Sequence, residues 1–97
     1  MSADYGLALT MVKQRLNRAP GDTVLDEYLA HRIEAAAGNL ADMGVIIRAG
    51  DTQDTMLLVD LAVWQYQNRD QAGAQPLWLR ARIRDRWVHE RRAADDP

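Results

Sequence analysis

The chain has 97 residues, 47% of them hydrophobic and 27% charged, which is typical of a single soluble globular domain spanning residues 1–97. It has no cysteine, which excludes disulfides, thiol catalysis and cysteine-ligated zinc. Its net charge of −2 is unevenly spread: residues 1–70 hold ten acids against six bases, whereas residues 77–94 hold six arginines against two acids. Such a molecule can attract copies of itself head to tail, or present its two ends to different partners.

The first predicted helix ends near Arg18, just before the break at Pro20. Leu9, Val12 and Leu16 recur at spacings of three and four residues, which places them on one face of a helix. We therefore expect this helix to bury one side against the rest of the domain.

The second predicted helix starts with Asp22 or Thr23 as its cap and ends at Gly44, which can adopt the left-handed conformation. Its apolar stripe consists of Leu25, Tyr28, Leu29, Ile33, Ala36, Leu40 and Met43. Gly38 costs about 1 kcal/mol relative to alanine inside a helix. We interpret Gly38 as a place where a neighbouring helix crosses closely; the alternative is an evolutionary accident without a structural reason.

Residues 45–47 are β-branched and too few for a helix, which predicts an extended segment or one short strand. A third helix then starts at Asp51 or Thr52 and runs to about Asp70. It is apolar nearly all round, with only a narrow polar stripe, so it is expected to be the central helix. Within it, Leu61 and Trp64 are predicted to be largely buried.

The fourth predicted helix begins at Pro76, which suits a first helical turn, and extends to about residue 94. Its apolar face carries Leu79, Ile83 and Trp87. Arginines flank that face on both sides, namely Arg80, Arg84 and Arg91 on one and Arg82 and Arg86 on the other. The fold class is therefore all-α, a small bundle of about four helices with one short extended segment after the second.

No residue set predicts a metal site or an enzyme. His31 has no second histidine at a ligand spacing, and a solvated helix face explains it. Asp51, Asp54 and Asp60 do not follow the calcium-loop pattern, and helix capping explains Asp51 and could explain Asp54. Phosphate-binding loops and nucleophile motifs are absent, so we expect no catalysis and no cofactor.

No run approaches the roughly 18 apolar residues of a membrane span, and the N-terminus lacks the basic start and apolar stretch of a signal peptide. We therefore expect no membrane partner. The expected location is the cytosol, or a particle that is assembled there.

The arginines of the fourth helix, with Trp78 and Trp87 among them, allow three interpretations. The helix could track the phosphates of a nucleic acid, it could be a solvated amphipathic face, or it could dock onto another protein. Tryptophan and arginine are both enriched in the energetic centres of protein interfaces. The sequence pattern does not separate these three possibilities.

Residues 7–72 resemble the small phage head–tail connector, or head-completion adaptor, proteins, including prophage copies. The resemblance begins with Val12, Lys13 and Leu16, continues through the long second helix, and is most specific in the segment LLVDLAVWQYQNRD at residues 57–70. There an apolar run closes on an aromatic-x-tyrosine-x-asparagine-arginine-acid segment. The residues that carry this motif are Leu57, Leu61, Trp64, Tyr66, Asn68 and Arg69.

The resemblance implies a structural virion protein without a cofactor. Members form a ring, dodecameric as a rule, that binds below the portal protein, extends the DNA channel and receives a stopper or tail-completion protein. DNA passes through the channel without sequence-specific binding. The implied location is the head–tail interface of the virion, and the host cytoplasm during assembly.

Connectors attach to the portal largely through their C-terminal part, which makes the basic helix at residues 76–94 the expected portal-docking element. The candidate docking residues are Trp78, Leu79, Arg80, Arg82, Ile83, Arg84, Arg86 and Trp87. Arg69 is expected to fix the end of the third helix, by pairing with an acid such as Asp70 or by capping carbonyls. The alternative function is a small cytoplasmic nucleic-acid-binding protein that uses the same arginine-rich helix.

Overall fold

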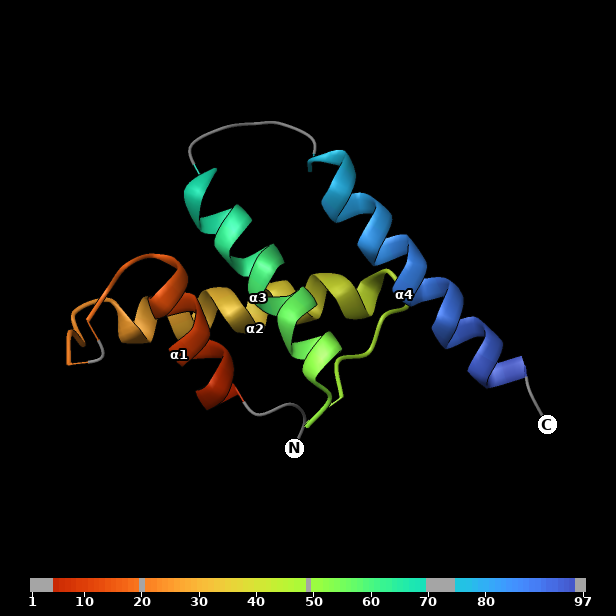
Figure 1. Ribbon diagram of the computed structural model, residues 1–97, viewed down its shortest axis with the longest axis horizontal. Coiled ribbons are helices and arrows are strands. Elements are labelled where there is room, and N and C mark those ends of the chain that lie inside the picture. Colours follow the sequence, from red (N-terminus) through yellow and green to blue (C-terminus); the bar gives the residue numbers. More distant parts are fainter. Residues whose placement is uncertain (1–4, 20, 49, 70–74, 96–97) are drawn as a thin grey trace.

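Four α-helices make up most of the chain that the computed structural model describes, which comprises residues 5–19, 21–48, 50–69 and 75–95 (Figure 1). They are α1 (Tyr5–Arg15), α2 (Asp26–Asp42), α3 (Thr52–Gln67) and α4 (Leu77–Asp95). The described residues contain no β-strand, so the predicted all-α fold is confirmed. None of these helices combines the length and the apolar character that crossing a membrane requires.

The third helix is central, as its nearly continuous apolar surface predicts. In Figure 1, α3 lies between α1 and α4, while α2 runs across it, and α3 packs against all three other helices. Leu61 is fully buried, but Trp64 is only partly buried and packs at the edge of the core. The core residues are Ala8, Val12, Leu29, Ile33, Ala36, Leu40, Val45, Ile47, Leu57, Leu58, Val59, Leu61, Ala62, Val63, Leu79 and Ile83.

The first helix ends earlier, and the second begins later, than the sequence predicts. The first ends at Arg15, because Asn17 takes the left-handed conformation (φ 59°) and the chain turns there. The second begins at Asp26, so the prediction of an Asp22 or Thr23 cap is wrong. Instead, the Asp22 carboxylate accepts a hydrogen bond from the Val24 amide and forms a turn ahead of the helix.

The two glycines of the second helical segment behave differently. Gly44 ends the helix with φ 88°, as predicted, and a Cβ added there would lie 2.8 Å from Nε1 of Trp87. By contrast, a Cβ added at Gly38 would meet nothing within 4 Å. No described helix of the same chain therefore crosses closely at Gly38, and that interpretation is wrong within one chain.

A short extended segment joins α2 to α3. Val45 and Ile47 are buried on one side of it, whereas Ile46 between them is exposed, as the alternation of an extended chain requires. Asp51 then caps α3, since its carboxylate accepts a hydrogen bond from the Asp54 amide at 3.0 Å. The predicted extended segment and the predicted Asp51 cap are both confirmed.

Candidate functional site

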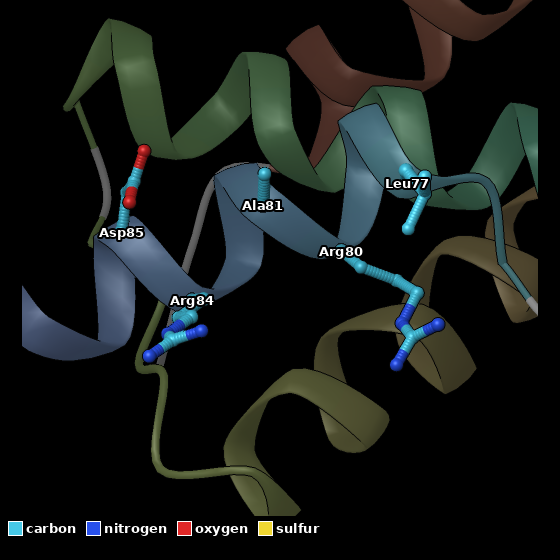
Figure 2. A pocket seen from close by; sticks show the side chains of 5 residues that line it. All are labelled: Leu77, Arg80, Ala81, Arg84 and Asp85. Carbon is cyan, nitrogen blue, oxygen red and sulfur yellow. The ribbon is translucent and has the colours of Figure 1, made fainter.

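The arginines of α4 divide into an inward pair and an outward group. Arg82 and Arg86 reach carboxylates on α3, whereas Arg80 and Arg84 point to another side of the helix (Figure 2). In the sequence, both sets flank one apolar strip and nothing distinguishes them. The packing of α4 on α3 makes them different.

Arg86 forms a two-pronged ion pair with Asp54 near the start of α3. Its Nε donates to Oδ1 at 2.6 Å and its Nη2 donates to Oδ2 at 3.1 Å. The Asp54 side chain is only 2% exposed and that of Arg86 only 11%. Such a bidentate pair fixes orientation as well as position, and breaking it would leave a buried charge without a partner.

A small network surrounds this pair and includes the extended segment. The Asp54 carboxylate also accepts a hydrogen bond from the Arg48 amide at 3.0 Å, and Arg86 donates to the Ile46 carbonyl at 3.1 Å. Glu90, one turn further along α4, accepts hydrogen bonds from Arg86 at 2.7 Å and from Arg48 at 3.0 Å. Residues 46–48, α3 and α4 are therefore joined through charged side chains.

The network keeps Asp54 ionised. Burial by itself would raise the pKa of Asp54, but hydrogen bonds from Arg86 and from the Arg48 amide, with the charges of both arginines, hold it below its ordinary value of 3.8. The hydrogen bond to Asp54 likewise raises the pKa of Arg86. Asp54 thus anchors α4, a role that helix capping does not describe.

A second acid of α3 holds two helices at once. Asp60 forms ion pairs with Arg15 of α1 and with Arg82 of α4, and its side chain is 12% exposed. In the sequence, Asp60 stands out only as part of a narrow polar stripe. The missed signal was the presence of acids on a helix otherwise apolar all round, because a buried carboxylate requires a cationic partner.

The outward arginines are free to meet a partner. Arg80 and Arg84 are exposed and form no ion pair with any residue in the described ranges. Both side chains project to the same side of α4, and Asp85 points in a different direction (Figure 2). These residues, with Leu77 and Ala81, line an open depression of about 550 Å³.

The two tryptophans of α4 lie at opposite ends of its packed section. Trp78 is 51% exposed and follows Leu77, which is 79% exposed. Trp87 is 38% exposed, rests on Gly44, and lies beneath the guanidinium of Arg91, whose Cζ is 5.3 Å from the ring centroid. Each end of the packed section therefore presents an aromatic ring beside arginines, a combination common at protein interfaces.

The candidate docking residues thus fall into two groups. Leu79 and Ile83 are buried against the core of their own chain, and Arg82 and Arg86 are occupied by Asp60 and Asp54. A partner could reach Leu79, Ile83 and Arg86 only if α4 left α3, whereas the Arg82 side chain is paired but 36% exposed. The members that stay accessible are Trp78, Arg80, Arg84 and Trp87.

The motif at the end of α3 forms a capped corner. The Asn68 side chain donates to the Trp64 carbonyl at 2.8 Å, and Arg69 donates to the Tyr66 carbonyl. The Arg69 guanidinium also stacks over the Tyr66 ring, with 4.3 Å between Cζ and the centroid. The predicted carbonyl capping by Arg69 is confirmed, while Asp70 lies outside the described residues.

Within the described residues, no group of three or more histidine and acidic side chains is arranged to hold a metal ion. His31 lies on the exposed side of α2. The outward side of α4 carries exposed arginines and two exposed or partly exposed tryptophans. That surface suits contact with another macromolecule.

Comparison of the chain with protein-family models, with curated proteins and with solved structures found no significant match.

Proposed function

We propose that the protein is a structural subunit of a ring at the portal vertex of a phage or prophage particle. In that ring it joins the DNA-filled head to the tail and extends the DNA channel. The proposal rests on the resemblance of residues 57–70 to head–tail connectors and on one structural observation. The N-terminal end of α4 exposes Leu77 and Trp78 beside two arginines without an ion pair to any described residue of the chain.

An exposed leucine and tryptophan favour burial against a partner. Removing apolar area from water contributes roughly 25 cal/mol per Å², and a tryptophan at the centre of an interface is often a hot spot. Arg80, next to that apolar contact, can pair with a carboxylate of a portal protein. Because Arg82 and Arg86 already hold α4 to α3, docking at this end leaves the fold of the subunit intact.

The nucleic-acid alternative has less support from the surface. Of the four arginines between residues 80 and 86, Arg82 and Arg86 pair with acids of α3. The chain as a whole carries a net charge of −2. Phosphate tracking would therefore depend on Arg80, Arg84 and the arginines near the end of α4. Passage of DNA through the ring requires no such binding.

A truncation before Pro76 would also remove Leu79 and Ile83 from the core and leave Asp54 buried without its cation, Arg86, so it would not separate a loss of docking from a loss of folding. A surface variant is sharper. The double substitution of Leu77→Ser with Trp78→Ala should lower binding to portal-bearing heads by at least about 30-fold, equivalent to a hot spot of about 2 kcal/mol. Binding is measured by co-sedimentation with heads from the phage or prophage whose genes adjoin the gene for this chain.

The matched controls remove exposed apolar side chains elsewhere, with Leu7→Ser on α1 and Val24→Ser before α2. Both controls should bind the heads as the wild type does. Failure of the wild-type protein to bind any portal-bearing head would refute the proposal. A salt-sensitive gel shift with duplex DNA, lost on substitution of Arg80 and Arg84 by alanine, would support the nucleic-acid alternative instead.

A further inference from the structure

We infer that copies of this protein associate head to tail through two different helix faces, the outward side of α4 on one copy and the outward side of α2 on the next. This inference deepens the proposed function and rests on it for its biological role, since a ring subunit needs two complementary surfaces.

The first face is a basic and aromatic stripe along α4. Arg80, Arg84, Trp87 and Arg91 follow one another at spacings of four, three and four residues, so they lie on one side of the helix. Among the described residues, none forms an ion pair with Arg80, Arg84 or Arg91. The stripe therefore presents three cations and a partly exposed ring to solvent.

The second face is an acidic stripe along α2. Glu27, Glu34, Gly38 and Asp42 lie at spacings of seven, four and four residues, which again places them on one side, with His31 among them. The core of the same chain takes the opposite side, through Leu29, Ile33, Ala36 and Leu40. The three acids are exposed and form no ion pair with another residue of the described chain.

The two stripes match in charge and in spacing. If the helices run antiparallel with Trp87 opposite Gly38, then Arg91 stands opposite Glu34 and Arg84 falls within one residue of Asp42. The Arg84-to-Arg91 distance along α4 is about 10.5 Å and the Glu34-to-Asp42 distance along α2 is about 12 Å, at roughly 1.5 Å per residue. Both charge pairs can therefore form on either side of the tryptophan.

This arrangement also explains Gly38. No described residue of its own chain approaches the position where a Cβ would lie, so intramolecular packing does not require a glycine there. A flat site between Glu34 and Asp42 lets a large ring from another copy approach the helix closely. Because the two faces differ, the contact is heterologous, and repeated use of it yields a closed ring or an open filament.

Charge reversal tests the contact in a way that a folding defect cannot imitate. Arg84→Glu and Asp42→Arg each place like charges at the proposed junction, so each variant alone should associate at least about tenfold more weakly than the wild type. In an equimolar mixture, the carboxylate introduced at position 84 of one variant meets the guanidinium introduced at position 42 of the other, and the reverse junction is native. The mixture should therefore recover wild-type association, measured by sedimentation velocity at low salt.

Gly38→Leu provides a second, independent test. The substitution meets no atom of its own chain at the Cβ position and adds a better helix former, so it should raise the melting temperature of the monomer. It should nevertheless weaken association, because the leucine blocks the approach of Trp87 from the next copy. Arg92→Glu is the matched charge control, since Arg92 is an α4 arginine outside the stripe, and it should associate as the wild type does.

Unchanged association of Arg84→Glu, or the lack of rescue in the mixture, would overturn the head-to-tail contact. So would a wild-type protein that stays monomeric at every concentration tested. The proposed function fails separately: a wild-type protein that associates through this contact but binds no portal-bearing head retains the contact and loses the connector role. Conversely, Asp42→Arg leaves the portal-docking end of α4 unchanged, so head binding by this variant without self-association would preserve the connector role alone.

Discussion

The three-helix body and the fourth helix are held in place by different forces. The body, α1 to α3, interlocks through a continuous set of buried aliphatic side chains, with Leu61 and Ile33 fully buried near its centre. Among the described residues, the fourth helix contributes Leu79 and Ile83 to that core and packs Trp87 on Gly44. Its other contacts with the body are mainly ionic, through Arg82, Arg86 and Glu90. Hydrophobic packing stabilises the body, and directed charge pairs set the position of α4.

This difference has a consequence for the surface of α4. Apolar packing tolerates small rotations of a helix, whereas a bidentate arginine–carboxylate pair permits only a narrow range of orientations. Asp54 and Asp60, less than two turns apart on α3, therefore fix which side of α4 faces outward. The inward arginines, Arg82 and Arg86, therefore determine where the exposed arginines and tryptophans of α4 lie.

The largest loss of stability should come from a substitution in the three-helix body. Leu61→Ala removes a fully buried side chain from the central helix and should lower the free energy of unfolding by about 2–5 kcal/mol, since lost transfer energy and the remaining cavity both contribute. Chemical denaturation followed by circular dichroism measures this loss. Leu7→Ala, at an exposed position of α1, is the matched control and should change stability by less than about 0.5 kcal/mol. If Leu61→Ala had wild-type stability, hydrophobic packing around Leu61 would not be what stabilises the three-helix body.

The second effect separates the inward and outward arginines of α4. Arg86→Met keeps much of the side-chain volume but leaves Asp54 buried without its cation, so it should cost about 3 kcal/mol. Arg84→Met, two residues earlier on the outward side, should be nearly neutral. Denaturation of both variants under one set of conditions is the measurement, and equal losses at the two positions would show that α4 is not anchored as described.

The smallest expected effect is a loss of folding stability at acidic pH. Folding lowers the pKa of Asp54 below its ordinary value of 3.8. The ionised Asp54 therefore contributes fully to the free energy of unfolding above pH 3.8, and this contribution is lost as the pH falls through the lower pKa of the folded state. The loss amounts to about 1.4 kcal/mol for each unit by which folding lowers the pKa. Comparing the pH slope of unfolding in wild type and Asp54→Asn isolates it, because the variant lacks this titration. Identical slopes below about pH 4 would contradict the lowered pKa.

Much of the fold could be predicted from local sequence. Four helical segments, the left-handed stop at Gly44, the Asp51 cap and the central place of residues 52–67 all follow from periodicity and capping chemistry, which act over a few residues. The ends near Arg18 and Asp22 were less predictable. There, turn conformations at Asn17 and Asp22 competed with helix, and both outcomes are compatible with the same residues.

The division of the arginines in α4 was decided only by tertiary structure. Arg82 and Arg86 find carboxylates 22 and 32 residues earlier in the chain, and no local pattern encodes a contact across that separation. The sequence by itself determined that α4 is amphipathic and basic, because that property belongs to one helix. Which of its cations face inward depends on where the acids of α3 lie once both helices are packed, since the strength of an ion pair depends on distance and burial in three dimensions.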